Sequence, residues 1–136
     1  MKKNLLFLML MAFLFSFESK SQCGYVSLIG EFNGWADDHY MTQDPMDPTD
    51  YSTIISFTAA MDTDGNDTIE VKFRENGDWA VNWGGDTFPS GTAVENGSNI
   101  LVPLDTGNVF TTDFLVTFNC ETLEYNFEAI CGSIGP

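Results

Sequence analysis

The chain has 136 residues, and 20 acidic residues against five basic ones give it a formal net charge of −15. Such acidity excludes most nucleic-acid and anionic-membrane binding, because neutralising phosphate requires clustered Lys and Arg side chains. Length and charge together predict one domain whose partners are neutral, such as sugars, or cationic, such as calcium.

Residues 1–21 have the pattern of a secretory signal peptide. The basic pair Lys2-Lys3 precedes an apolar run over 5–15, and small residues stand before a cleavage site near Ser21-Gln22. The run is too short to span a bilayer, which takes about 20 apolar residues. Cleavage would remove three lysines and one glutamate, leaving two basic and nineteen acidic residues and a net charge of about −17. We therefore expect a secreted or outer-surface protein without membrane insertion; the residues before Cys23 lack a lipobox, which argues against a lipid anchor there.

Residues 22–130 are predicted to form one all-β domain, an immunoglobulin-like antiparallel β-sandwich of about seven strands. Short apolar or alternating runs recur between turn dipeptides such as Asn76-Gly77, and no segment after the signal shows a sustained helical period. The predicted strands are Tyr25–Phe32, Tyr51–Thr58, Ile69–Glu75, Trp79–Trp83, Asn99–Leu104, Phe110–Phe118 and Leu123–Ile130.

The predicted hairpin around Asn76-Gly77 carries two tryptophans and both basic residues that remain after cleavage, Lys72 and Arg74. A two-residue type I′ turn would place Arg74 opposite Trp79, with Trp83 on the same outer face as the two cations. A three-residue loop would turn both indoles into the core, because a one-residue slip exchanges the two faces of a strand. We favour the tight turn, since Asn-Gly is the strongest short hairpin signal.

An exposed indole flanked by basic side chains suits a sugar ring. The C–H face of a pyranose packs on the electron-rich face of an aromatic ring, while cationic and amide donors reach the ring hydroxyls. A phosphate or carboxylate ligand would require more basic residues than the two that this chain keeps after cleavage. The hairpin therefore predicts a neutral carbohydrate ligand.

Three cysteines follow the predicted signal, and secretion favours their oxidation. Cys120 lies in the turn before the last strand, which would separate it from Cys131 by roughly 25 Å at about 3.3 Å per residue, too far for a disulfide. We therefore predict a Cys23–Cys120 disulfide, with Cys131 free or paired in a further repeat. Residues 131–136 resemble the Cys-Gly start of the domain, so they form either a frayed tail or the start of a tandem copy.

Five motifs occur in a distinctive order, GEFNGW, VKFRENGDW, NWGGD, PSG and GSNI, at Gly30–Trp35, Val71–Trp79, Asn82–Asp86, Pro89–Gly91 and Gly97–Ile100. This order resembles the starch-binding domains of SusE/SusF-type outer-membrane proteins. It resembles more distantly the family 48 carbohydrate-binding modules, which include the glycogen-binding module of AMP-activated kinase β subunits. The likeness covers nearly the whole mature chain and implies an immunoglobulin-like sandwich that binds α-glucan without cleaving it. Trp83 and the heavy acidity fit the SusE/SusF-type pattern better than the kinase module.

The resemblance also implies which residues contact the sugar. Trp35 closes the Phe-Asn-x-Trp motif that contributes to the sugar platform of the glycogen-binding module. Lys72 corresponds to the Lys of the Lys-Phe strand, and Trp79 to the Trp after the turn. Asn99 matches the Asn before the Ile-containing strand, although Ser98 takes that place if the alignment shifts by one residue.

The run DTDGNDTI at Asp62–Ile69 copies the start of a calcium-binding EF-hand loop, with Asp62, Asp64 and Asn66 as candidate ligands. Asp67 stands where that loop needs Gly, and Phe73 stands where it needs a bidentate Glu. We therefore favour an acidic hairpin turn, and a calcium ion bound by Asp62, Asp64 and Asn66 is the alternative interpretation. We predict no other cofactor.

Catalytic patterns are missing from the sequence. His39 is the single histidine, so neither a His-rich metal site nor a Ser-His-Asp triad can form, and no two acids are singled out as a glycosidase pair. We therefore predict a non-enzymatic module for starch or another α-glucan, with further tandem domains as additional partners. The alternative is a structural or calcium-stabilised spacer or adhesin domain of a larger surface protein with no ligand of its own. A plain structural spacer would have all of its tryptophans buried, whereas a calcium-dependent adhesin domain would depend on the ion for its stability.

Overall fold

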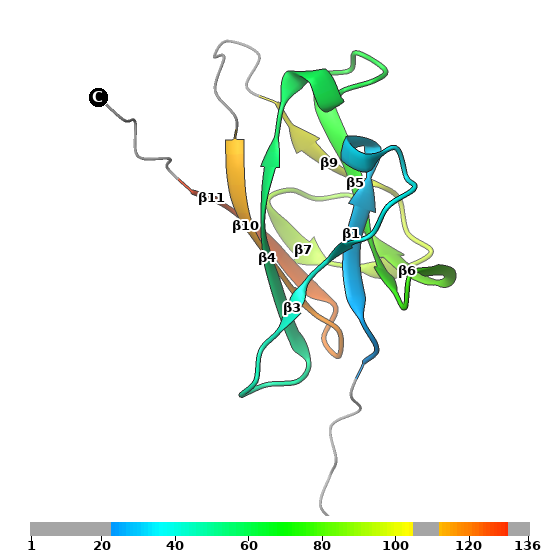
Figure 1. The fold of residues 1–136 in the computed structure, drawn as a ribbon, viewed down its shortest axis with the longest axis vertical. Helices are drawn as coiled ribbons and strands as arrows, with labels where there is room; N and C mark the ends of the chain where they lie inside the picture. Colours follow the sequence, from blue (N-terminus) through cyan, green and yellow to red (C-terminus); the bar gives the residue numbers. More distant parts are fainter. Residues whose placement is uncertain (1–22, 105–111, 131–136) are drawn as a thin grey trace, which may run out of the picture.

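The computed structural model describes residues 23–104 and 112–130, so the predicted signal peptide and the tail 131–136 lie outside the described residues. Within these ranges the chain forms two antiparallel sheets that face each other across a shared core (Figure 1). This architecture confirms the predicted all-β sandwich. The helices in this part of the chain are two short 3-10 turns, η1 (Glu31–Asn33) and η2 (Ala59–Met61), and none is long and apolar enough to cross a membrane.

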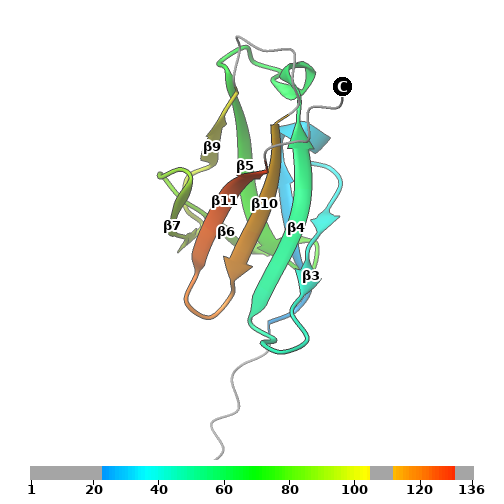
Figure 2. The same cartoon turned by 90° about the vertical axis from the view of Figure 1, so that its left-hand side faces the viewer.

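The first sheet, sheet A, has six strands in the order β2-β1-β5-β6-β8, with β9 also paired to β5. These strands are β1 (Val26–Gly30), β2 (His39–Tyr40), β5 (Thr68–Glu75), β6 (Asp78–Gly84), β8 (Val94–Glu95) and β9 (Ile100–Pro103). The second sheet, sheet B, has five strands in the order β3-β4-β10-β11-β7 (Figure 2). They are β3 (Thr42–Gln43), β4 (Asp50–Phe57), β7 (Ser90–Thr92), β10 (Thr112–Asn119) and β11 (Glu124–Ile130).

Each of the seven predicted strands has a counterpart, namely β1, β4, β5, β6, β9, β10 and β11. The start of the predicted strand 110–118 lies partly outside the described residues. The strands that were not predicted, β2, β3, β7 and β8, have two or three residues each. Such short segments carry no alternating pattern, because they exist only through pairing with a longer neighbour.

The core between the sheets is rich in aromatic rings. On β5 the side chains of Ile69, Val71 and Phe73 are fully buried, as the strict alternation in this strand requires. Phe73 stacks on Phe118 of sheet B with the ring centroids 4.4 Å apart. Each such buried side chain contributes roughly 1.5–3 kcal/mol to folding, so the two sheets are held together mainly by this apolar contact.

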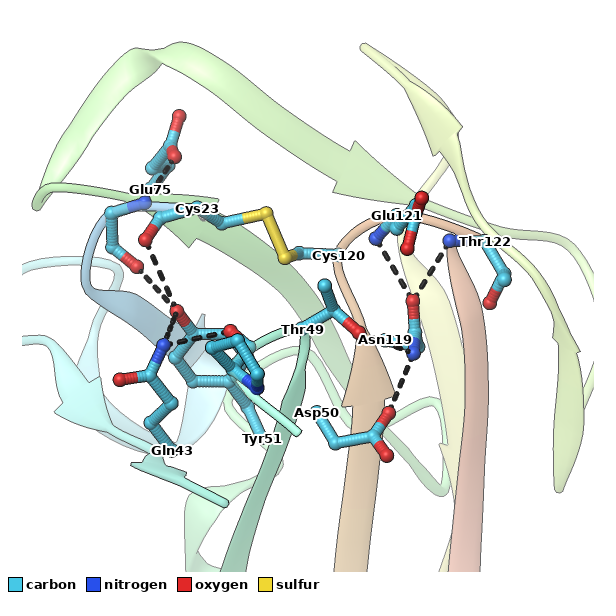
Figure 3. Close-up of a disulfide and its surroundings, with 12 residues drawn as sticks. Cys23, Gln43, Thr49, Asp50, Tyr51, Glu75, Asn119, Cys120, Glu121 and Thr122 are labelled. Carbon is cyan, nitrogen blue, oxygen red and sulfur yellow. Dashed lines mark hydrogen bonds between the residues drawn. A yellow bond between two sulfur atoms is a disulfide. The ribbon is translucent and has the colours of Figure 1, made fainter. Parts of the chain in front are cut away.

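A disulfide joins Cys23, just before β1, to Cys120 in the β10–β11 turn, with a Cα–Cα distance of 6.3 Å (Figure 3). The predicted pairing is therefore confirmed. The hydroxyl of Tyr51 donates to the carbonyl oxygen of Gly24 at 2.9 Å, which fixes the segment beside the bond.

Candidate functional site

The β5–β6 hairpin turns through Asn76-Gly77, whose φ angles of 54° and 64° are both positive, as a type I′ turn requires. Glu75 pairs with Asp78 across this turn, which confirms the predicted two-residue bend. Asn76 fastens the bend to the segment before β1: its backbone N–H donates to the carbonyl oxygen of Tyr25 at 2.7 Å, and its side-chain oxygen accepts the N–H of Tyr25 at 3.1 Å. These hydrogen bonds explain why the tight turn forms although the two residues that flank it, Glu75 and Asp78, are both acidic.

Beyond the turn the pairing slips. Arg74 pairs with Asn82 and Phe73 with Trp83, so the three residues that begin at Trp79 bulge out of the ladder. The predicted pairing of Arg74 with Trp79 is therefore wrong. Because an odd number of residues is inserted, Trp83 is turned to the inner face while Trp79 stays outside.

This slip settles where the two hairpin tryptophans lie. Trp83 is 6% exposed and packs in the core, with its ring centroid 5.2 Å from that of Phe118. The prediction that Trp83 lies on the outer face as a sugar contact is therefore wrong. Trp79 is 43% exposed, so the alternative expectation that all tryptophans are buried is wrong as well.

Asn82 holds the bulge closed. Its side-chain NH₂ donates to the carbonyl oxygen of Trp79 and to the side-chain oxygen of Asn96, both at 2.9 Å. The carbonyl oxygen of Asn82 in turn accepts the backbone N–H of Asn96 at 2.9 Å. The sequence offered one signal of this arrangement, an Asn within an otherwise apolar strand, but its partner Asn96 is supplied by the later β8 region.

On the outer face of sheet A, which points away from sheet B, Trp79 meets Trp35. The two indole centroids are 6.0 Å apart and the ring planes are inclined by 41°; we call these two residues the tryptophan pair. Trp35 follows η1, and its backbone N–H donates to the carbonyl oxygen of Gly30 at 2.9 Å, which turns the chain back over the sheet. Gly30 allows this close approach, since a Cβ there would lie 2.2 Å from the carbonyl oxygen of Glu70. The two tryptophans predicted from the family resemblance are thus brought together.

Arg74 lies behind the tryptophan pair. Its guanidinium carbon is 4.8 Å from the centroid of Trp79, within the range of a cation–π contact. Its Nε and Nη2 each donate to the carboxylate of Asp38 at 2.7 Å, and Asp38 also accepts the hydroxyl of Ser27 at 2.5 Å. The hydrogen bond from Arg74 lowers the pKa of Asp38, and the same bond raises the pKa of Arg74.

Arg74 was predicted to donate to ligand hydroxyls, and this prediction is corrected by its surroundings. The residue is 6% exposed and its guanidinium is engaged by Asp38 on one side and Trp79 on the other. It therefore supports the exposed indole from below, and Asp38 ties the loop that carries Trp35 to the same guanidinium. Nothing in the sequence distinguished Asp38 from the other acidic residues as the partner of Arg74.

Lys72 and Asn99 lie beside each other on the same face. Asn99 precedes Ile100, which pairs with Val71, so the antiparallel register places it next to Lys72. Burial lowers the pKa of Lys72, and within residues 23–104 and 112–130 its ammonium forms no hydrogen bond or ion pair. The side-chain NH₂ of Asn99 makes a long 3.3 Å hydrogen bond to Glu70. Lys72 and Asn99, the two polar residues predicted to contact the sugar, therefore have donor groups that are free or only weakly hydrogen-bonded within the described residues.

The acidic turn at 62–68 differs from the predicted calcium loop in one ligand. Carboxylate oxygens of Glu31, Asp62 and Asp64 lie within 4.8 Å of one another. The side-chain oxygen of Asn66, in contrast, accepts the backbone N–H and the hydroxyl of Thr68 at 2.9 and 2.6 Å. The acidic cluster therefore contains Glu31 in place of the predicted Asn66, and no local motif could have indicated Glu31 because it comes from η1.

Glu31 is also the structural anchor of this turn. It is 6% exposed, and its carboxylate accepts the backbone N–H and hydroxyl of Thr63 at 2.5 and 2.7 Å and the N–H of Asp64 at 3.3 Å. Burial opposes the ionised form, but these hydrogen bonds lower the pKa of Glu31 below its usual value. Desolvation, the Asp62 side chain and the charge of Glu31 raise the pKa of Asp64. A cation would relieve this repulsion.

A hollow of about 700 Å³ lies on the outer face of sheet B, opposite to the tryptophan pair. Ser52, Thr117 and Asn126 form a polar row across three strands at its floor. The aromatic residues in its lining, Tyr51, Phe118 and Tyr125, are at most 4% exposed, so they offer no ring face to a ligand. We therefore assign the candidate site to the tryptophan pair.

Comparisons of this chain with protein-family models, with curated proteins and with solved structures found no match. The likeness to starch-binding domains therefore rests on the motifs in the sequence and remains a prediction.

Proposed function

We propose that the protein is a secreted, non-catalytic module that binds a neutral polysaccharide, starch or another α-glucan, at the tryptophan pair. The observation that carries this proposal is the exposed indole of Trp79 set against Trp35 on the outer face of sheet A. Exposed aromatic faces at a protein surface are costly to keep in water, which favours a role in recognition.

Each neighbour has a distinct part in the proposed site. The indoles of Trp35 and Trp79 stack on sugar rings, while the amide of Asn99 and the ammonium of Lys72, which has no partner among the described residues, donate to hydroxyl groups. Arg74 makes no contact with the ligand and instead holds Trp79 in place. Because Asp38 neutralises Arg74 locally, the surface suits an uncharged ligand better than an anion.

The disulfide supports the proposed secretion. Disulfides persist in oxidising compartments outside the cytosol, and Cys23 is the second residue after the predicted cleavage site. The proposed location is therefore the exterior or outer surface of the cell.

A calcium-stabilised spacer or adhesin domain is the second candidate. It is favoured by the carboxylate oxygens of Glu31, Asp62 and Asp64 that lie within 4.8 Å of one another. In this function the ion would restrain the 62–68 turn, and the tryptophan pair would have no ligand.

Retention on insoluble starch tests the proposal. We expect the wild-type protein to be retained and Trp79→Ala to pass through, with little loss of thermal stability because the side chain is 43% exposed. Ile54→Ala is the matched control, since Ile54 is 63% exposed on the outer face of sheet B. Equal retention of wild type and Trp79→Ala, or failure of the wild type to bind any α-glucan, would contradict the proposal.

A further inference from the structure

We infer that the binding surface continues beyond the tryptophan pair onto a second aromatic subsite formed by Tyr25 and Tyr40. The ligand is then a polysaccharide chain that crosses both subsites, not a short oligosaccharide. This inference rests on the proposed function and adds a preference for chain length to it.

The strand register places Tyr40 on the outer face of sheet A, and the alternation of side chains leading into β1 places Tyr25 there too. Tyr40 of β2 pairs with Ser27 of β1, whose hydroxyl reaches the outward carboxylate of Asp38. Tyr25 stands two residues before Ser27, so it projects to the same side. Tyr25 and Tyr40 are therefore diagonal neighbours, a relation that keeps long side chains within reach of each other.

Both rings are open to solvent. Tyr25 is 77% exposed and Tyr40 is 58% exposed, more than the 43% of Trp79. A hollow of about 340 Å³ lies against the two side chains. Neither ring belongs to the buried core cluster, so the packing between the sheets does not account for two exposed aromatic residues side by side.

The two subsites meet at the hairpin turn. A Cβ added to Gly77 would lie 3.2 Å from the carboxylate of Asp38 and 3.3 Å from the hydroxyl of Tyr40, so these groups touch the turn that leads to Trp79. Asp38 in turn binds Arg74, on which Trp79 rests. The outer surface therefore runs from the tryptophan pair, over Asp38, to Tyr40 and Tyr25 without leaving this face.

The chemistry of the surface suits an uncharged chain of pyranose rings. Tyrosine offers an apolar ring face and a hydroxyl that donates and accepts hydrogen bonds, and a pyranose offers C–H faces and ring hydroxyls in return. The cation between the subsites is already paired, because Arg74 and Asp38 form a bidentate pair. A repeating neutral ligand can therefore occupy both subsites at once.

Calorimetric titration with maltotriose and maltoheptaose tests this inference on wild type, Tyr25→Ala and the control Ile54→Ala. We expect Tyr25→Ala to bind maltoheptaose roughly two- to tenfold more weakly than wild type, as the loss of one stacked ring implies. Its affinity for maltotriose should be unchanged, because the tryptophan pair is intact. Tyr25→Phe should keep most of the affinity for the longer ligand. Tyr40→Ala is a second variant with the same expectation, checked for folding by its melting temperature.

Other results would overturn the inference. If wild type binds both ligands and Tyr25→Ala and Tyr40→Ala bind them equally well, the tyrosine subsite is refuted while the proposed function stands. If wild type binds neither ligand, the proposed function fails and the subsite fails with it. If the free protein forms a concentration-dependent dimer that Tyr25→Ala abolishes, the tyrosines serve self-association instead.

Discussion

The guanidinium of Arg74 lies directly under the indole of Trp79, 4.8 Å from the ring centroid, while two 2.7 Å hydrogen bonds tie it to Asp38. The positive charge of Arg74, which the sequence places close to the exposed Trp79, is therefore paired with Asp38 and is not available to a ligand. The exposed aromatic surface depends on a buried ion pair, so the stability of this pair and the proposed ligand binding are linked.

Asp38→Asn should lower the free energy of unfolding by about 3 kcal/mol, because the change leaves the buried Arg74 guanidinium without its charged partner. The side chains of Arg74 and Asp38 are only 7% and 11% exposed, so solvent cannot replace the lost contact. Urea unfolding followed by circular dichroism measures the effect. A change below about 0.5 kcal/mol, the size typical of exposed pairs, would show that the pair is not structural.

Stability should fall in acid because of Glu31 and Asp38, whose pKa values are both lowered by hydrogen bonds in the folded protein, against the opposing effect of burial. A carboxyl group with a depressed pKa stabilises the fold above its unfolded pKa of about 4, and this contribution is lost as the pH falls through the folded pKa. The melting temperature should therefore drop below about pH 4. The Glu31→Gln variant should be less stable than wild type at neutral pH, and its melting temperature should fall less steeply in acid. If the melting temperatures of variant and wild type fall in the same way with pH, the role of Glu31 is refuted.

Calcium should raise the melting temperature if the acidic turn holds an ion, because the cation offsets the desolvation and the repulsion from Asp62 and Glu31 that raise the pKa of Asp64. Thermal scans with added calcium or with a chelator measure this effect. Asp64→Asn should remove the response to calcium while keeping the turn, which Glu31 anchors through Thr63. A melting temperature that is the same in calcium and in chelator would exclude the calcium-stabilised spacer.

Removing the disulfide should destabilise the domain by about 2–5 kcal/mol, because Cys23 and Cys120 close a long loop in the unfolded chain. They are 97 residues apart in sequence. The Cys23→Ser, Cys120→Ser double variant is compared with wild type in urea, with and without a reducing agent. The reducing agent should lower the stability of wild type to that of the double variant and leave the double variant unchanged.

Much of the fold could be predicted from local sequence. Strict alternation identified β5, the reach of an extended strand identified the disulfide, and the Asn-Gly dipeptide identified the bend between Glu75 and Asp78. The strand and the bend depend on residues that are near one another in the chain. The disulfide joins distant cysteines, and it was predicted because one extended strand keeps Cys120 and Cys131 too far apart to pair.

The errors share a different origin. The slip between Asp78 and Asn82 places Trp83 in the core, and it involves a hydrogen bond from Asn82 to Asn96, which lies in the turn after β8. Asp38 and Glu31 are likewise recruited from the segment after β1 to partners on β5 and in the 62–68 turn. Contacts between segments that are distant in the chain do not produce a periodic pattern of apolar and polar residues. They therefore could not be predicted from the local sequence.

Tryptophan fluorescence with maltoheptaose tests the central claim most directly, because the structure separates the tryptophan pair, in which Trp79 is exposed and Trp35 is half-buried, from the buried Trp83. Wild type should emit at long wavelength, and maltoheptaose should change that emission through Trp79 and Trp35. The Trp35→Phe, Trp79→Phe double variant keeps only Trp83, so its emission should be blue-shifted and indifferent to the sugar. A sugar-responsive double variant, or a wild type whose emission ignores maltoheptaose, would contradict the account.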